Sequence, residues 1–420
     1  MRVLLLGSGA KDHAVAWWFS KSCYLSELYV AQGNLATGRF AINLSDVNPS
    51  DPQSVYEACR KHKIDYVFIG TEAPLFTGVV KFLNERGIKT FGAPEGSIKL
   101  EGDRAFSRAF ATRHNIQIPR SSLFADMEGL EKYLERHKGE YFMIKSNSIS
   151  PSRIMLSSND TEALLNYARL LFKKGPVLLE AFVKGTPASC SILVDRNGYA
   201  LLPVTSDYTN KASDDTTPTG GMGAICPVPI IEEIKDKIIE RIINPTLYGM
   251  QVEDLAYKGI LTLSLMITPE REPYLVDYHV RFNDPAAQAM IPIIKTDLIE
   301  ILNAMENDRV GSLKIETTDE CTVAVVLASP GYPMYPVTGM EVEGLTNAFL
   351  EPIDEGPIVF CGAIQNIDGV PTTTGGRNLT VVGKGRNIAE ANKQAYDTIK
   401  RKSFPNLWFR KDIGNAYFIS

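Results

Sequence analysis

The chain has 420 residues, of which 44% are hydrophobic and 22% charged, and its net charge is −5. This composition is typical of a globular protein of about three domains, and no basic run indicates nucleic acid as a partner. The six cysteines show no CxxC spacing, which argues against a zinc or redox motif and fits a cytoplasmic protein. No apolar run reaches membrane-spanning length and no signal peptide is recognised, so we expect no membrane partner.

Residues 1–100 predict a parallel α/β domain. Short apolar strands are expected at 1–7, 27–31, 65–70 and 88–92, with helices at about 52–62 and 75–86 between them. Two strands end in the turns Gly7-Ser-Gly9 and Gly70-Thr-Glu72, at the sheet edge where such domains bind ligands. The first turn lacks the later glycine of a dinucleotide motif, because position 12 is Asp. Glu72 is interpreted either as an acid that favours a helix N-terminus or as a ligand for ribose hydroxyls.

Residues 101–316 predict an α+β unit. Helices are expected at about 101–114, 160–173, 231–250 and 296–307. Strands are expected at 141–146, 153–156, 177–182, 190–194, 200–205, 259–267 and 273–280. From 317 to 420, short strands, Gly/Pro turns and a helix at about 387–402 indicate a smaller C-terminal domain.

A glycine-rich segment, Thr219-Gly-Gly-Met-Gly-Ala, follows a polar stretch of the central unit. Its glycines permit a ligand to approach the backbone closely and expose N–H groups. The segment therefore predicts a loop that covers a ligand, with a flexible loop without chemistry as the alternative.

Charged residues cluster at the end of the strand expected at 273–280. Asp277, His279 and Arg281 alternate, so their side chains project from one face, and Asn283-Asp284-Pro follows. A carboxylate, an imidazole and a guanidinium on one face suit a metal or anion site. An edge strand with a solvated face explains them equally well from the residues alone.

These motifs together resemble the phosphoribosylamine–glycine ligase family, whose members are ATP-grasp enzymes of purine biosynthesis. The resemblance runs from Met1 to about Gly414. It is carried by Gly7-Ser-Gly with His13, Gly33-Asn34, Gly70-x-Glu72-Ala-Pro-Leu75, Leu100-Glu-Gly, Thr219-Gly-Gly-Met-Gly, Arg281-Phe-x-Asp284-Pro, Gly331-Tyr-Pro, Gly375-Gly-Arg377 and Arg410-x-Asp-Ile-Gly414.

The resemblance implies that ATP drives the joining of glycine to phosphoribosylamine through an acyl phosphate. It implies an α/β and α+β multidomain fold with an N-terminal domain at 1–100, ATP-grasp lobes at 101–316 and a C-terminal domain at 317–420. The mobile lobe is expected at about 118–190. The implied cofactors are ATP and Mg²⁺ or Mn²⁺, the partners are the two small substrates, and the expected state is a monomer or dimer.

The resemblance also implies residue roles. Catalysis is assigned to Arg281, Asp284 and Lys145, and the metal to Asp277 and His279. The nucleotide is assigned to Arg104, Lys145, Arg153 and Glu180. The substrates are assigned to Gly9, Asn34, Glu72, Pro74, Asp207, Thr219, Gly220, Gly221, Met222 and Gly223.

The departures from the family pattern concentrate on the nucleotide site. The family's glycine-rich phosphate loop corresponds here to residues 145–154, which contain no glycine and include Pro151. The family's ribose-binding glutamate is absent at Pro187, and a Glu and Asn for the metal become Asp277 and His279. We therefore expect weak ATP binding, and we expect Asp277 and His279 together to prefer Mn²⁺ or Zn²⁺ over Mg²⁺.

Two other functions remain open at this point. One is a relative that binds a phosphoribosyl ligand without catalysis, which the missing loop glycines favour. The other is an ATP-grasp ligase for a different amine and carboxylate, for which changes at Asn283, Ala286 and Ala287 leave room.

Overall fold

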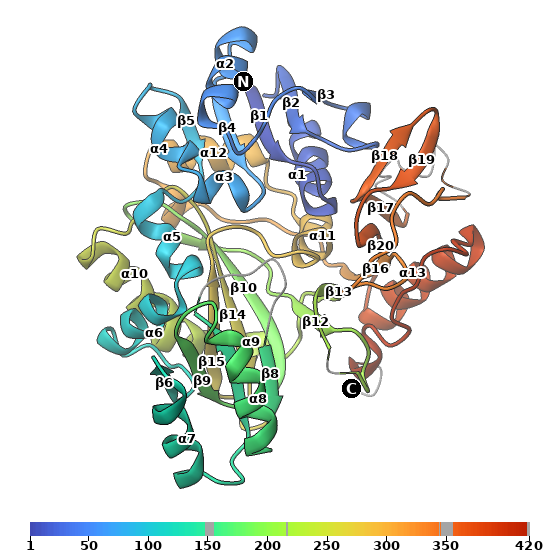
Figure 1. Ribbon diagram of the computed structural model, residues 1–420. Helices are drawn as coiled ribbons and strands as arrows, with labels where there is room; N and C mark the ends of the chain where they lie inside the picture. The colour runs from blue at the N-terminus through green and yellow to red at the C-terminus, as the bar shows by residue number, and fades with distance from the viewer. Residues whose placement is uncertain (148–154, 216, 344, 346–355, 418–420) are drawn as a thin grey trace.

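The computed structural model describes residues 1–147, 155–215, 217–343, 345 and 356–417, and its strands form five sheets. Figure 1 shows the parallel N-terminal sheet around β1 and β4 above the long strands β10 and β14, with the C-terminal strands and α13 to one side. No helix within these ranges is both long and apolar enough to cross a membrane.

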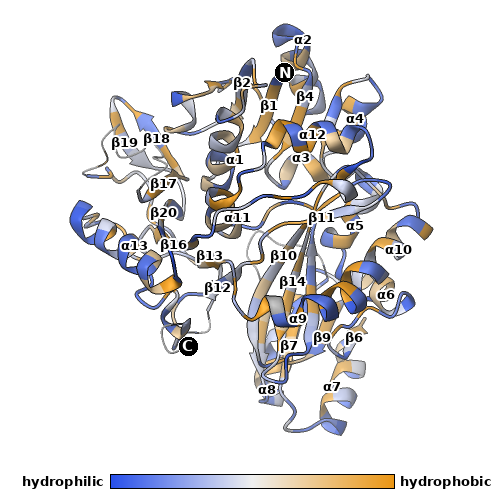
Figure 2. Cartoon of the chain, turned by 180° about the vertical axis from the view of Figure 1, so that it is seen from behind, coloured by the Kyte–Doolittle hydropathy of each residue, from blue (hydrophilic) through white to orange (hydrophobic). Residues whose placement is uncertain are grey.

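The N-terminal sheet has the order β3-β2-β1-β4-β5, and each neighbouring pair is parallel. Alternate residues of β1 face opposite layers: Val3 and Leu5 pack with α1, whereas Leu4 and Leu6 pack with α2 and α4. Because both faces are covered, the central strands β1 and β4 are apolar along most of their length, as their orange colour in Figure 2 shows. The elements are β1 (Arg2–Gly7), β2 (Glu27–Gln32), β3 (Ile42–Asn43), β4 (Tyr66–Ile69), β5 (Lys89–Phe91), α1 (Ala10–Ser20), α2 (Pro52–His62), α3 (Ala73–Phe76) and α4 (Val79–Asn84).

A small antiparallel sheet of order β6-β9-β7-β8 has its own apolar core. Ile144 of this sheet packs with Leu130 and Leu134 from one helix and Leu164 from another. The elements are β6 (Ser121–Phe124), β7 (Phe142–Ser146), β8 (Met155–Ser158), β9 (Val177–Ala181), α7 (Met127–Arg136) and α8 (Thr161–Leu171).

The second central sheet has the order β11-β10-β14-β15 and presents a polar face. Ser189, Ser264 and Asp277 lie opposite one another across three antiparallel strands, so their side chains share that face. Its elements are α5 (Glu95–Gly102), α6 (Arg104–Arg113), β10 (Thr186–Val194), β11 (Tyr199–Leu201), α9 (Ile231–Ile238), α10 (Asn244–Val252), β14 (Gly259–Ile267), β15 (Pro273–His279), α11 (Ala286–Met290) and α12 (Leu298–Glu306).

The C-terminal sheet has the order β12-β13-β16-β20-β17, and α13 packs on β20 and β16. The first two strands of this sheet come from residues 206–226, well before residues 317–420, where the C-terminal domain was expected. The elements are β12 (Ser206–Asn210), β13 (Pro218–Cys226), β16 (Cys321–Ala328), β17 (Ile358–Cys361), β20 (Arg377–Gly385), α13 (Ile388–Lys402) and the hairpin of β18 (Ile364–Ile367) and β19 (Val370–Thr373).

The expected fold class is confirmed, and several local predictions need correction. The helix expected at 101–114 is interrupted at Asp103, whose backbone is extended and separates α5 from α6, and the strand expected at 200–205 ends at Leu201. The helix expected at 75–86 is split into α3 and α4 at Gly78, whose φ is 77°. The helix expected at 231–250 contains a π-helical segment, Ile239–Ile243, just before Pro245, which has no N–H to donate. The prediction of a loop at residues 219–223 is wrong, because this segment lies in β13, which pairs with β12 and β16.

Candidate functional site

A cleft of about 980 Å³ lies where the N-terminal sheet, both central sheets and the C-terminal sheet meet. The predicted site residues that line it are Gly9, Glu72, Arg104, Thr219, Gly220, Asp277, His279, Arg281 and Asp284. Residues without a predicted role also line it, among them Glu101, Tyr167, Tyr332 and Arg377. The fold therefore brings residues from positions 9 to 377 to one cleft.

The start of α1 forms the wall of the cleft at Gly9. The Asp12 carboxylate accepts hydrogen bonds from the backbone N–H groups of Ser8 (3.0 Å) and Gly9 (2.9 Å). A Cβ atom at Gly7 or at Gly70 would lie 2.2 Å from this carboxylate, so both strand ends need glycine. The two glycine turns recognised in the sequence therefore make room for Asp12, whose pKa is raised by burial.

Arg281 connects two carboxylates at the centre of the cleft. Its guanidinium donates to Glu101 at 2.9 Å and also pairs with Glu72. Glu101 receives two further hydrogen bonds, from the backbone N–H of Val280 at 2.8 Å and from His279 Nδ1 at 3.1 Å. Burial opposes ionisation of Glu101, but Arg281 and these hydrogen bonds outweigh it and lower its pKa to about 2.

The depressed pKa of Glu101 predicts loss of stability in acid. Because the folded pKa lies below the ordinary value of 4.5, the ionised carboxylate stabilises the fold above about pH 4.5. This contribution, on the order of 3 kcal/mol, is lost as the pH falls from about 4.5 to about 2. We expect Glu101→Gln to lower the urea midpoint at pH 7 and to flatten its decline in acid.

The matched control is Glu140→Gln, which removes an exposed carboxylate that also bonds a histidine and an arginine, His137 and Arg120. Its urea midpoint at pH 7 should stay close to that of the wild type. Equal acid sensitivity of the wild type and Glu101→Gln would contradict the assignment.

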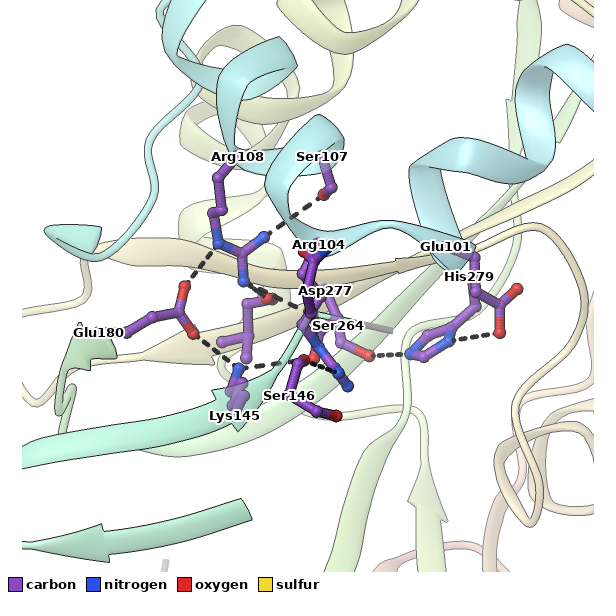
Figure 3. Close-up of polar contacts among 12 residues, drawn as sticks. Glu101, Arg104, Ser107, Arg108, Lys145, Ser146, Glu180, Ser264, Asp277 and His279 are labelled. Atoms are coloured by element: carbon purple, nitrogen blue, oxygen red, sulfur yellow. Dashed lines mark hydrogen bonds and ion pairs between the residues drawn. The ribbon is translucent and has the colours of Figure 1, made fainter. Parts of the chain in front are cut away.

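Asp277 and four other charged side chains form a largely buried cluster (Figure 3). Lys145 Nζ lies 2.7 Å from Glu180 and 3.6 Å from Asp277, although the two carboxylates belong to different sheets. Arg108 Nε lies 2.5 Å from Glu180, and its terminal nitrogen lies 3.5 Å from Asp277. Arg104 completes the cluster, 3.6 Å from Asp277. Burial opposes ionisation of Asp277, but the three cations outweigh it and hold its pKa well below its usual range.

Asp284 anchors the other end of the cleft. Its carboxylate accepts hydrogen bonds from Arg377 at 3.0 Å and from Gln288 at 2.9 Å. Arg377 also donates to the carbonyl of Gly220 at 2.8 Å, while the N–H of Gly220 donates to the hydroxyl of Tyr332 at 2.8 Å. This network ties the start of β13 to Asp284, which follows β15, and to Tyr332 and Arg377 of the C-terminal segment.

Several predicted ligand residues lie outside the cleft lining and make internal contacts. Asn34 is buried and donates to the carbonyls of Ser8 (2.9 Å) and Cys361 (2.7 Å), so it holds two strand ends together. Asp207 is bonded to the hydroxyls of Ser189 and Thr205. The remaining residues of this kind are Pro74, Gly221, Met222, Gly223, Lys145 and Glu180. Arg153 lies outside the described residues.

Three residues of the networks had no predicted role. Glu101 had a signal, since it is the glutamate of the Leu100-Glu-Gly motif, whereas Arg108 looks like an ordinary helix cation. Arg377 had a signal, since it ends the Gly375-Gly-Arg377 motif.

The residues at the expected metal position fit a resident divalent ion poorly. Both ring nitrogens of His279 have hydrogen-bond partners, Glu101 and Ser264, at 3.1 Å each. Asp277 faces three cations, and no cluster of three or more potential ligands occurs among the residues that the structure describes. The metal role of Asp277 and His279 stays a prediction that this geometry does not favour.

Comparisons with known proteins identify the family of the chain. Models of phosphoribosylglycinamide synthetase match it with the N domain at residues 1–101, the ATP-grasp (A) domain at 102–287 and the C domain at 322–416. Phosphoribosylamine–glycine ligases from Clostridium acetobutylicum and Escherichia coli O6:H1 are each 32% identical to it, covering 99% of this chain and 100% and 98% of their own lengths. The crystal structure of phosphoribosylamine–glycine ligase from Thermotoga maritima matches with a TM-score of 0.82 and 28% identity, over 98% of this chain and 100% of that one. The chain therefore belongs to the phosphoribosylglycinamide synthetase family.

Proposed function

We propose that the chain is a carboxylate–amine ligase that joins glycine to phosphoribosylamine with ATP, the activity that the names of its relatives state. The observation that carries the proposal is the cleft, because one cavity is lined by two charged residues of the central unit, Arg281 and Asp284, together with Gly220 and Glu72. A ligase of this kind must align a carboxylate, an amine and a phosphoryl donor and keep water out. The three proposed units, 1–100, 101–316 and 317–420, each supply a wall of this cleft.

In this proposal the chain's residues divide the work between two ends of the cleft. Arg281, held in place by Glu101 and Glu72, binds carboxylate or phosphate oxygens, and Asp284 accepts hydrogen bonds from an amine. Glu72, with a half-exposed side chain, faces ribose hydroxyls. ATP, when bound, supplies the phosphoryl group that activates the carboxylate, and we assign its phosphates to Arg104, which lines the cleft, and to Lys145, which lies buried behind it.

The finer features of the proposal follow from the family. Enzymes with an ATP-grasp domain use ATP and a divalent ion, and we propose that Mg²⁺ or Mn²⁺, where it is present, is held by the phosphates of ATP and not by side chains of the protein. We also propose that the chain acts in the cytoplasm as a monomer or dimer, without nucleic acid or membrane.

The test is ADP formation with each substrate omitted in turn. We expect ADP release to require both glycine and phosphoribosylamine. Replacing glycine with β-alanine is the control, because its longer chain moves the carboxylate out of register with Arg281. ADP release with β-alanine but not with glycine would instead support a ligase for a different carboxylate.

ATP should bind weakly in comparison with relatives that retain a glycine-rich phosphate loop. Each missing charge-assisted hydrogen bond costs about 1.5–3 kcal/mol, so two or three losses weaken binding by several orders of magnitude. Lys145 is also committed to Glu180 at 2.7 Å, a contact that phosphate must compete with. Calorimetry with ATP measures this affinity, and tight, magnesium-dependent binding would contradict the expectation.

A further inference from the structure

We infer that strand β15 offers no site for a divalent cation in this chain. In its place, the nucleotide phosphates are neutralised by Arg104, which lines the cleft, and by the charges of Arg108 and Lys145 buried behind it. The inference deepens the proposed function. The part that concerns nucleotide phosphates rests on that function, whereas the part that concerns a metal ion alone does not.

The first observation is the surroundings of Asp277. One carboxylate oxygen lies 3.6 Å from Arg104 Nε and 3.5 Å from an Arg108 terminal nitrogen, and the other lies 3.6 Å from Lys145 Nζ. A magnesium ion binds a carboxylate oxygen at about 2.0–2.1 Å. An ion at that distance from Asp277 would lie within a few ångströms of three positive groups, and repulsion between charges so close opposes its binding.

The second observation is the hydrogen bonding of His279. Nδ1 lies 3.1 Å from the Glu101 carboxylate, which only accepts hydrogen bonds when ionised, so the proton is on Nδ1. Nε2 lies 3.1 Å from Ser264 Oγ, which in turn accepts from the side-chain amide of Asn283 at 3.4 Å. With the proton on Nδ1, Nε2 accepts from the hydroxyl of Ser264, so a metal ion at either ring nitrogen would have to displace a hydrogen bond (Figure 3).

The third observation links these contacts to the departures from the family. His279 and Asn283 both differ from the family pattern, and both bond the same hydroxyl, Ser264. The Asn283 amide also donates to Ser189 at 3.0 Å, and the Ser189 hydroxyl bonds Asp207. The two substitutions thus form one buried network that reaches from the cleft to Asp207, which explains why Asp207 is buried away from the cleft.

The charge of the cluster suits a bare polyphosphate. Three cations, Arg104, Arg108 and Lys145, face two carboxylates, Glu180 and Asp277, which leaves one excess positive charge (3 − 2 = 1). A fixed positive charge attracts metal-free ATP more strongly than ATP whose charge is partly neutralised by magnesium. The chain should therefore reverse the usual preference for the magnesium complex.

The first arm of the test titrates Mn²⁺ alone into the protein without nucleotide, followed by electron paramagnetic resonance. We expect no saturable site up to about 1 mM Mn²⁺, the range of weak protein sites, and identical titrations for the wild type and Asp277→Asn. Saturable binding of one ion by the wild type that disappears in Asp277→Asn would overturn the inference.

The second arm measures ATP affinity with excess EDTA and with excess Mg²⁺. We expect metal-free ATP to bind at least as tightly as its magnesium complex. Arg104→Met should weaken the binding of metal-free ATP about tenfold, which is about 1.4 kcal/mol. Arg113→Met is the matched control, since Arg113 lies in the same helix but pairs with Glu253 outside the cleft. Binding that is tenfold tighter with Mg²⁺ would overturn the inference. If neither form of ATP binds, the proposed function fails, and the Mn²⁺ arm still decides the inference.

Discussion

Replacing Arg281 with methionine is expected to reduce ligation by about 10²–10³-fold, the effect of removing a positioned charge from a reacting site. The same change should destabilise the fold by about 3–5 kcal/mol, because it leaves Glu101 buried without its cation. Glu101 is 5% exposed, and Arg281 is the only lysine or arginine paired with it among the residues that the structure describes. Urea denaturation and ADP release measure the two effects separately.

The double variant Arg281→Met/Glu101→Gln separates the effect of Arg281 on stability from its effect on ligation. Neutralising Glu101 removes the unpaired charge, so most of the stability should return while activity stays low. Arg271→Met, which removes an exposed partner of Glu233, is the matched control and should leave both quantities nearly unchanged. Full activity in Arg281→Met would contradict the role of Arg281.

The second large effect is expected at Lys145, which is 2% exposed. Lys145→Met leaves Glu180 and Asp277 with the two arginines alone, and the loss of one partner from a buried ion pair costs about 3–5 kcal/mol. The two sheets that the cluster joins, through β7 and β15, should also separate more easily, so limited proteolysis between them should accelerate. Urea midpoints and protease digestion measure these results.

Lys132→Met is the control for Lys145, because Lys132 forms an exposed pair with Glu128 one helical turn away. The double variant Lys145→Met/Glu180→Gln should recover stability but not ATP binding. An unchanged urea midpoint in Lys145→Met would show that the cluster does not hold the two sheets together.

Much of the fold follows from local pattern. The predicted helix at 52–62 coincides with α2, because Asp51 caps its start and Pro52 is at the first position. The long strand predicted at 259–267 coincides with β14, whose residues are mostly buried. The glycine-rich segment 219–223 was misplaced because the partners that make it a strand, β12 and β16, are not visible in its own residues.

The site was less predictable, since residue type does not reveal which polar group a side chain will contact. Asn34 and Asp207 look like ligand residues in the sequence, yet both satisfy internal groups. The alternation of Asp277, His279 and Arg281 did place all three at the cleft. What it left open is that Glu101, from a distant helix, bonds two of them.

The most direct measurement is a single turnover with the protein in excess over phosphoribosylamine, with ¹³C-labelled glycine and a series of ATP concentrations below saturation, and detection of the product by mass spectrometry. The account predicts a product that carries the mass of labelled glycine and forms slowly, because ATP binds weakly. The Arg281→Met variant should form much less product over the same time. Absence of product at every ATP concentration, while a phosphoribosyl ligand still raises the melting temperature, would contradict catalysis and leave a protein that only binds its ligand.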